Sequence, residues 1–212
     1  AEKIIHDKEK QKINYENAKL YLYGYPVFYT PAFYHPDPTV KRQSGFLAPS
    51  IMNSTLLGSG INLPYYFAIA DHRDATLIPK IYADENPVLQ TEYRHVTKNS
   101  YSILDASYNR GYKKTSDKKT GGSRNHFFAR SDINLDLEMF DESNLLINYQ
   151  KASNDTYLKV HGIDSKLKTS DSTMHSSIDM NFAKNRSSME INMDVYEDLS
   201  KPATSDRYEY VL

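Results

Sequence analysis

Cysteine and tryptophan are both absent from the 212 residues of the chain. Without cysteine, these residues can form no disulfide framework, no thiol nucleophile and no thiolate metal site. The chain also has almost no net charge, because 26 basic and 27 acidic residues leave a net charge of −1. A protein that coats nucleic acid carries a strong positive excess, so we expect no nucleic-acid partner.

Long apolar runs are also missing. No stretch approaches the roughly 18 apolar residues that a membrane-spanning helix requires. The first ten residues, AEKIIHDKEK, contain no apolar segment of the kind found in a signal peptide, so we expect a mature or cut chain. Tyrosine is abundant instead, with 18 residues in a chain that is only 39% hydrophobic. Many tyrosines in a polar chain favour a β-protein with large hydrated surfaces.

Alternation of apolar and polar residues is the strongest pattern, and it is clearest in the second half. In residues 129–139, one set of alternate positions is apolar or small and the other is polar: Ala129, Ser131, Ile133, Leu135, Leu137 and Met139 against Arg130, Asp132, Asn134, Asp136 and Glu138. A period of two predicts a strand with one apolar and one charged face. We therefore expect Arg130, Asp132, Asp136 and Glu138 to share a hydrated face.

Both a soluble β-sandwich and a transmembrane β-barrel show such alternation. Two features favour the barrel. The repeat is about 10 residues long, and tight connections alternate with the long polar loops 110–124 and 151–172. The fold class that we predict is all-β. The expected barrel strands are 44–52, 59–69, 73–83, 87–97, 100–110, 124–139, 143–151, 173–183 and 187–199.

Residues 1–43 differ from the rest of the chain. They predict a strand pair, KINYENAKLYLYG and PVFYTP, followed by a proline-rich connector, PAFYHPDP. Four prolines between Pro26 and Pro38 are typical of an extended link between two units. We therefore place a domain boundary after residue 43, with residues 44–212 forming the second unit.

Signatures of catalysis or metal binding are weak. The seven histidines are scattered and form no close ligand pair, and the sequence contains no GxSxG, phosphate-binding loop or dinucleotide fingerprint. The carboxylates on alternating positions fit a hydrated face better than an acid–base pair. We expect no catalytic residues, no metal and no cofactor, and therefore no enzyme.

Two prolines stand where strands are expected. Pro49 lies in GFLAPSIM and Pro64 in GINLPYYF, the segments that predict the first two barrel strands. Proline cannot donate to a β-ladder and is normally found at sheet edges or bulges. Pro49 and Pro64 are therefore expected to weaken pairing between these strands.

Several long motifs in this region resemble one family. They are PVFYTP at 26–31, PDP-x-x-KR-x-SGFL-x-PS at 36–50, PYYFAIA at 64–70, D-x-T-x-x-P at 74–79 and SNDTYL at 153–158. These motifs are similar to those of the lipopolysaccharide-assembly protein family LptD, also called organic solvent tolerance protein. The resemblance covers most of the chain and is looser after residue 110.

The resemblance implies a periplasmic β-jellyroll followed by a large barrel in the cell outer membrane, which moves lipopolysaccharide into the outer leaflet. Residues 1–43 would then be the end of the jellyroll, in the periplasm, and residues 44–212 about nine barrel strands. In that setting Pro49 and Pro64 would flank a lateral gate, and Leu20, Leu22 and Phe28 would be candidates for a lipid path. Packing in the core of the sheet is an equally good interpretation of those three residues.

The resemblance also implies partners. They are lipopolysaccharide, an LptE-type lipoprotein that plugs the barrel, and an LptA-type bridge protein that would meet a segment before residue 1. Two other interpretations stay open on the residues alone. One is a soluble β-sandwich binding module, and the other is an outer-membrane barrel of a different kind, a porin or a hydrolase. A hydrolase would require an acid, a histidine and a serine grouped at the outer rim.

Overall fold

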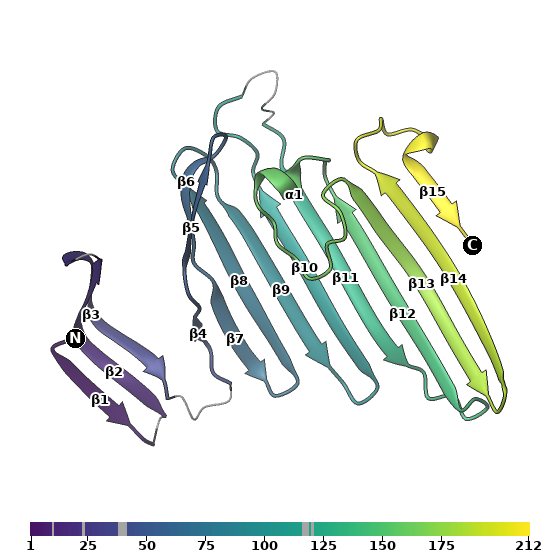
Figure 1. Ribbon diagram of the computed structural model, residues 1–212, viewed down its shortest axis with the longest axis horizontal. Coiled ribbons are helices and arrows are strands. Elements are labelled where there is room, and N and C mark those ends of the chain that lie inside the picture. Colours follow the sequence, from purple (N-terminus) through teal and green to yellow (C-terminus); the bar gives the residue numbers. More distant parts are fainter. Residues whose placement is uncertain (10, 23, 38–41, 116–118, 120) are drawn as a thin grey trace. The chain divides into compact units, whose positions relative to one another are not determined.

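The computed structural model describes residues 1–212 except residues 10, 23, 38–41, 116–118 and 120, and it gives the backbone alone for residues 20, 22, 27, 28, 35, 36 and 205. The chain divides into two compact units, Ala1–Gly45 and Phe46–Leu212. Figure 1 colours them along the sequence, from purple for the first unit to yellow at the end of the second.

The first unit is a three-stranded antiparallel sheet in the order β1-β2-β3. Its strands are β1 (Lys3–Asp7), β2 (Lys12–Leu22) and β3 (Tyr25–Pro36). The expected strand pair is present as β2 and β3, and β1 was not predicted. The prediction of a proline-rich connector is wrong for residues 31–36, which continue β3.

Two features of this sheet explain why prolines occur in β3. The strand lies at the edge of its sheet, where only one side of the backbone has a neighbour. In addition, Pro31 faces Asn17, at which the partner strand is irregular, with φ of +50°. The missing N–H of Pro31 therefore costs no regular ladder bond.

The second unit contains one antiparallel sheet, in which the described residues form twelve strands. They are β4 (Gly45–Phe46), β5 (Ser50–Ser54), β6 (Gly58–Asn62), β7 (Tyr65–Ala70), β8 (Arg73–Tyr82), β9 (Val88–Val96), β10 (Ser100–Asn109), β11 (Arg124–Asn134), β12 (Glu142–Ala152), β13 (Thr173–Lys184), β14 (Ser187–Asp198) and β15 (Tyr208–Val211). From β8 to β15, neighbours in sequence are neighbours in the sheet, as Figure 1 shows. The described sheet is open, with β5 and β15 as the end strands of its main path.

Most of the expected strands are confirmed to within a few residues, and their connections alternate as predicted. Tight turns join the strands at one end of the sheet, for example at 71–72, 97–99 and 185–186, and we call this the turn end. The segments 55–57, 83–87, 110–123, 153–172 and 199–207 lie at the opposite end, which we call the loop end. Two short helices occur in these loops, α1 (Tyr157–Val160) and η1 (Ser205–Arg207).

The prediction that one strand extends from 124 to 139 is wrong at its end. β11 stops at Asn134, whose side-chain oxygen accepts the backbone N–H of Asp136 at 2.9 Å. This local turn competes with the ladder, and Asp136 adopts a φ of +52°, outside the extended region. Asp136 and Glu138 therefore lie exposed in the connection after β11 and not on the polar face of the strand.

The two faces of the sheet differ in chemistry. Cross-strand partners point to the same side, so the register defines each face. One face, the apolar face, carries large hydrophobic side chains that are exposed: Ile51, Phe67, Ile81, Leu89, Tyr108, Phe127, Ile147, Tyr149, Ile178, Met189, Ile191 and Met193. The other face, the polar face, carries charged and amide side chains, including Asp74, Arg94, Arg130, Asp132, Asn148 and Asp194.

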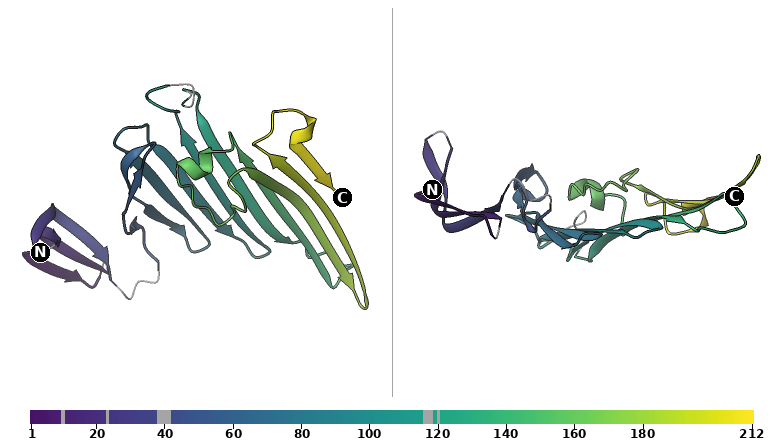
Figure 2. Two further views of the ribbon diagram at one scale, coloured as in Figure 1. Left: turned by 45° about the horizontal axis from the view of Figure 1, so that its top comes forward. Right: turned by 90° about the horizontal axis from the view of Figure 1, so that it is seen from below.

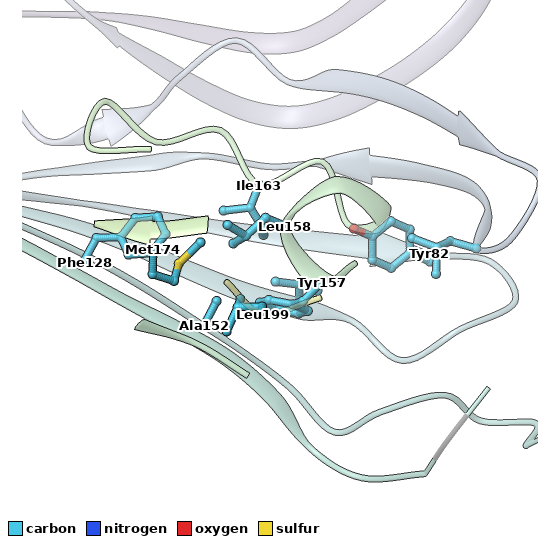
Figure 3. Close-up of a cluster of buried hydrophobic side chains, with 10 residues drawn as sticks. Tyr82, Phe128, Ala152, Tyr157, Leu158, Ile163, Met174 and Leu199 are labelled. Carbon is cyan, nitrogen blue, oxygen red and sulfur yellow. The ribbon is translucent and has the colours of Figure 1, made fainter. Parts of the chain in front are cut away.

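Loop 153–172, which contains α1, covers part of one face. Figure 2 shows α1 to one side of the sheet, and Figure 3 shows the buried side chains between loop and strands. The buried hydrophobic cluster consists of Leu57, Tyr82, Val88, Phe128, Ala152, Tyr157, Leu158, Ile163, Met174 and Leu199. Phe128, Tyr82 and Val88 belong to the polar face, so the buried core of this unit lies on the side opposite the exposed apolar face. Among the described residues, no helix is long and apolar enough to cross a membrane.

Two adjacent residues of β12 test the assignment of the faces. Ile147 lies on the apolar face opposite Ile178, and Asn148 lies on the polar face opposite Ser177. If the apolar face contacts lipid, as the barrel expected from the sequence requires, Ile147→Arg in the full-length protein should greatly reduce the amount of folded, membrane-inserted protein. The reason is that arginine on a lipid-facing strand costs about 2–4 kcal/mol near the midplane.

The matched control is Asn148→Arg, which adds the same side chain to the other face and is expected to be tolerated. Heat-modifiable migration on a denaturing gel, which separates folded from unfolded barrels, measures both variants. A harmless Ile147→Arg together with a damaging Asn148→Arg would reverse the assignment of the faces.

Candidate functional site

The edge of the sheet that contains Pro49 and Pro64 is built from two interrupted strands. The expected first strand is divided into β4 and β5 by residues 47–49, and the second into β6 and β7 by residues 63–64. β5 pairs with β6, and β4 pairs with β7. Each proline therefore lies within a break, and both breaks lie at the same level of the sheet.

The backbone around Pro64 shows what the proline removes. The Leu63 N–H donates to the Pro79 carbonyl of β8 at 3.1 Å, so the peptide groups of Leu63 point toward β8. Because successive residues of a strand point their peptide groups to opposite sides, those of Pro64 point toward β4. The Pro64 carbonyl accepts the Leu47 N–H at 2.9 Å. Pro64 has no N–H, so the second hydrogen bond of this pair cannot form.

The register also changes at this level. Ser50 lies opposite Asn62, so an uninterrupted ladder would place Ala48 opposite Pro64. The observed bond instead joins Leu47 to Pro64, one residue out of register. Such a shift is characteristic of a β-bulge, which bends the strand and leaves one residue unpaired. Two missing donors and a register shift thus coincide at the edge of the sheet.

The polar face presents a series of charged pairs along neighbouring strands. Arg94 Nε lies 2.8 Å from Asp74 Oδ1 and 3.6 Å from Glu92 Oε1. Arg130 Nε lies 3.2 Å from Asp132 Oδ2, so two of the four residues expected on a hydrated face contact one another on this face. Both of these side chains are partly exposed.

Farther along the polar face, the His175 ring stacks on the Tyr196 ring with a centroid separation of 4.5 Å. Its Nε2 lies 2.6 Å from Asp194 Oδ1. A face with this many exchangeable hydrogen-bond donors and acceptors suits a hydrated surface that contacts sugars or water.

Loop 153–172 is fixed to the polar face by side chains of β8 and β9. Lys80 Nζ donates to the carbonyl of Gly162 at 2.5 Å, and Tyr82 OH donates to the carbonyl of His161 at 3.2 Å. Gln90 Nε2 donates to the carbonyl of Asp164 at 2.9 Å. These bonds satisfy backbone carbonyls that the docked loop would otherwise bury without partners.

An acid, a histidine and a serine meet beneath this loop. Register places Ser107 directly opposite His126, and the Ser107 Oγ lies 2.5 Å from the His126 Nδ1. The His126 Nε2 lies 3.1 Å from an Asp105 oxygen, and Tyr157 OH lies 2.7 Å from the Ser107 Oγ. His126 was expected to be one of seven scattered histidines, because a serine and a histidine 19 positions apart form no local motif.

This grouping has the composition of a hydrolase triad but not its accessibility. Asp105, Ser107 and His126 are all buried, and the Ser107 hydroxyl is shared between His126 and Tyr157. β10 pairs with strands on both sides, so backbone N–H groups next to Ser107 belong to the ladder and do not form an oxyanion site. The arrangement is that of a satisfied buried network that holds the loop against the sheet.

His161 is the most unusual polar group in the loop. The residue is 3% exposed, and neither of its ring nitrogens has a hydrogen-bond partner among the described residues. The rings of Tyr82, Tyr112 and Tyr157 surround it at centroid distances of 5.9, 6.4 and 5.0 Å. Burial, followed by the nearby cations Arg124 and Lys80, lowers the pKa of His161 to about 4.

Three other residues that the sequence singled out belong to the first unit. The side chains of Leu20, Leu22 and Phe28 lie outside the described residues, so their role in a lipid path stays a prediction. No group of three or more potential ligands that could hold a metal occurs in the described part of the chain.

Comparison with known proteins identifies the family. Residues 13–207, most of the chain, match the family model described as LptD protein. The chain belongs to the LptD family. Its resemblance to this family, expected from the motifs between residues 26 and 158, is thereby confirmed.

Curated LptD relatives match over parts of their length. The LPS-assembly protein LptD of Pseudomonas aeruginosa (strain UCBPP-PA14) is 42% identical over 92 residues, which are 43% of this chain and 10% of the relative. The protein of the same name from Legionella pneumophila (strain Paris) is 31% identical over 169 residues, 75% of this chain and 20% of the relative. That of Ralstonia nicotianae is 32% identical over 157 residues, 74% of this chain and 18% of the relative. The chain therefore spans about a tenth to a fifth of the length of these LptD relatives.

The burial of His161 predicts that docking of the loop depends on pH. Because its pKa in the docked state lies below the ordinary value of 6.5, docking favours the neutral ring. Docking is then strongest above pH 6.5 and weakens as the pH falls toward 4, with about 2 kcal/mol lost at pH 5 by linkage. The groups that face the ring are Lys80, Tyr82, Glu85, Tyr112, Arg124 and Tyr157.

Hydrogen exchange of the amides of residues 158–163, corrected for the intrinsic effect of pH, measures this weakening. We predict that protection falls between pH 7 and pH 5 in the wild type, and that His161→Phe, which cannot titrate, greatly reduces the fall. Equal pH dependence in the wild type and the variant would show that His161 does not control docking.

Proposed function

We propose that this chain forms part of the wall of an outer-membrane β-barrel that moves lipopolysaccharide into the outer leaflet, and that its proline-interrupted strands border a lateral exit. The observation that carries the proposal is the combination, in one sheet, of an exposed apolar face, a charged face and an edge weakened at Pro49 and Pro64. Membership of the LptD family and the names of the relatives as LPS-assembly proteins support it.

The chemistry of lipopolysaccharide fits this arrangement. Its acyl chains require an apolar environment, and its sugars and phosphates require a hydrated one. In the proposed barrel, the polar face lines the lumen, with Arg130 and Asp132 among its charged groups, and the apolar face contacts the membrane. Lipopolysaccharide can reach the outer leaflet only if the wall of the barrel opens sideways, because its sugars would otherwise have to cross the hydrocarbon layer.

Weak pairing at the edge would lower the free energy needed for such an opening. A backbone hydrogen bond contributes roughly 0.5–1.5 kcal/mol net, and more where water cannot replace it. In the proposed barrel, the edge formed by β4 and β5 closes against the last strand, and Pro49 and Pro64 lower the cost of separating the wall at this seam. The function needs no covalent step, so we infer a transporter and not an enzyme.

The partners and the location of the first unit follow from the same proposal. Residues 1–43 form the end of a periplasmic jellyroll that receives lipopolysaccharide from an LptA-type bridge protein, and an LptE-type lipoprotein occupies the barrel. Leu20, Leu22 and Phe28 are candidates for lining the lipid path there. The three-stranded antiparallel sheet of this unit is compatible with a piece of a jellyroll.

The alternatives fit the structure less well. A soluble sandwich would pack a second sheet on the apolar face, but the large hydrophobic side chains of this face are exposed in the described part of the chain. A hydrolase would use the grouping of Asp105, Ser107 and His126, which is buried beneath the loop.

The first test concerns the prolines. We predict that a Pro49→Ala, Pro64→Ala double substitution in the full-length protein leaves the barrel folded, because each alanine restores a backbone N–H. Tighter pairing should reduce surface lipopolysaccharide per folded barrel by several-fold and sensitise cells to bulky antibiotics. The amount of folded barrel is quantified independently. An unchanged ratio of lipopolysaccharide to barrel would remove Pro49 and Pro64 from the exit.

A second test concerns orientation. The absence of cysteine from these residues allows single-cysteine labelling in a background without accessible thiols. We predict that Lys114→Cys at the loop end reacts with an impermeant thiol reagent on intact cells, whereas Lys98→Cys at the turn end reacts only after the outer membrane is permeabilised. Both side chains are exposed, so burial does not explain a difference. The opposite labelling would invert the orientation of the sheet.

A further inference from the structure

Three connections meet at the loop end of the sheet beside the interrupted edge. They are the tip of the β5–β6 hairpin at 55–57, the β8–β9 connection at 83–87 and the β10–β11 connection at 110–123. Three residues, one from each connection, are joined by direct bonds. We call Leu56, Glu85 and Lys119 the rim clasp.

Lys119 is the centre of the rim clasp. Its Nζ donates to the backbone carbonyl of Leu56 at 3.0 Å and to Glu85 Oε1 at 3.0 Å. The same ammonium group lies 5.1 Å from the centroid of the Tyr112 ring, and Arg124 approaches that ring at 4.6 Å. One side chain therefore joins the hairpin tip to two loops that are separate from it in sequence.

Glu85 supplies a buried negative charge to the rim clasp. The residue is 4% exposed, and its Oε2 accepts the backbone N–H of Lys113 at 2.7 Å. Burial alone would raise the pKa of Glu85, but the Lys113 N–H and the Lys119 ammonium outweigh it and hold the pKa below its ordinary value. A charge-assisted bond between two partly desolvated groups is stronger than an exposed ion pair.

The hairpin tip is held by packing as well. Leu57 is 1% exposed and belongs to the buried cluster with Tyr82, Val88 and Tyr157. The backbone at Gly58 approaches the Asp84 carboxylate so closely that a β-carbon there would lie 2.3 Å from an oxygen, and its φ is +76°. The Ala83 N–H donates to the Ser59 carbonyl at 2.8 Å. The loop end of the hairpin is therefore firmly attached to β8 and its loop.

The two ends of the interrupted strands thus differ. Toward the turn end, β4 and β7 are separated from β5 and β6 by the breaks at Pro49 and Pro64. Toward the loop end, the β5–β6 hairpin is fixed by the rim clasp and by Leu57. β6 is held by its own pairing with β8 at Gly60, Ile61 and Asn62, whereas β5 is the end strand and pairs with β6. Release of the attachment at the tip therefore frees the tip and β5 first.

From this geometry we propose that the rim clasp holds the tip of the β5–β6 hairpin in the closed position, and that release of Lys119 from Leu56 and Glu85 lets the tip and the end strand β5 move about the break at Pro49. The inference rests on the proposed lateral exit and assigns Lys119 and Glu85 as positioning residues for it. They control how often the exit opens and contact no lipopolysaccharide themselves.

The direct test measures the mobility of the hairpin tip. A nitroxide attached at Thr55→Cys, an exposed position of the tip, reports local motion in the full-length protein. We expect Lys119→Met, which keeps the aliphatic stem but removes the donors, to narrow the lines of the electron paramagnetic resonance spectrum markedly, since the label then moves faster. Glu85→Gln leaves the bond from Lys119 to Leu56 but removes the charge that holds Lys119 in place, so it should also raise the mobility. The double variant should be no more mobile than Lys119→Met alone, because Lys119 takes part in both bonds.

Two control variants separate the clasp from general effects of charge. Lys114→Met removes an exposed lysine of the same loop and should leave the spectrum unchanged. Lys119→Arg retains donors for Glu85 and should restore most of the immobilisation. An immobile tip in Lys119→Met, or equal mobility in Lys114→Met, would overturn the proposal.

The functional readout is sensitivity of cells to a bulky glycopeptide antibiotic, normalised to the amount of folded barrel. We expect Lys119→Met and Glu85→Gln to lower the inhibitory concentration at least four-fold, and Lys114→Met to leave it unchanged. A mobile tip with unchanged antibiotic sensitivity would show that the hairpin tip does not control the exit. The Pro49→Ala, Pro64→Ala variant tests the exit itself, so failure of the clasp and failure of the proposed function give different results.

Discussion

Backbone hydrogen bonding is the constraint on which the rest of this structure depends. In the proposed barrel, the apolar face contacts lipid, where no water is available to bond with peptide groups. Each strand must therefore be paired along its length. From β8 to β14 the antiparallel ladders largely meet this requirement. Between β12 and β13 the pairing ends at Asn148 and Ser177, and side-chain bonds of Gln150 and Ser176 replace the ladder beyond it. At the edge of the sheet, the requirement is relaxed at the breaks of residues 47–49 and 63–64, where Pro49 and Pro64 have no N–H to donate.

The polar side of the sheet is organised by a second requirement, that buried polar groups have partners. Backbone carbonyls of loop 153–172 lie against this face, and the side chains of Lys80, Tyr82 and Gln90 donate hydrogen bonds to them. Ser107, His126 and Asp105 satisfy one another beneath the loop together with Tyr157. The His161 ring lacks a hydrogen-bond partner at both nitrogens among the described residues, and we expect its protonation to weaken docking of the loop. The residues that keep the loop docked and the histidine whose protonation is expected to weaken docking are therefore neighbours.

Local periodicity explains how much of the fold the sequence could predict. A period of two is set by each residue and its nearest neighbours, so most of the strands and their faces were accessible from the residues alone. Pro49 and Pro64 indicated weaker pairing, but the division of strands 44–52 and 59–69 into two pieces each was not predicted. The end of β11 was not, because a side-chain bond from Asn134 to the Asp136 N–H overrides an alternating pattern that continues to residue 139. β3 continues through Pro31 because it is an edge strand, a property of the sheet and not of the segment.

The candidate site was predicted only in part for the same reason. The pair Arg130 and Asp132 follows from alternation within one strand. The contacts of Ser107 with His126, of Lys119 with Leu56 and of Lys80 with Gly162 join residues 19, 63 and 82 positions apart, and only the register and the folded loops bring them together.

The central claim is that pairing is weakest at the level of Pro49 and Pro64, and residue-resolved amide hydrogen exchange of the full-length protein in a lipid bilayer tests it most directly. The account predicts fast exchange at Leu47, whose N–H is bonded to Pro64 across the break. It predicts slow exchange at Met52 and Ile61 within the β5–β6 hairpin and at Leu104 in the centre of β10. Equal protection at all these positions would contradict the account, because it would mean that the prolines interrupt the strands without weakening the sheet.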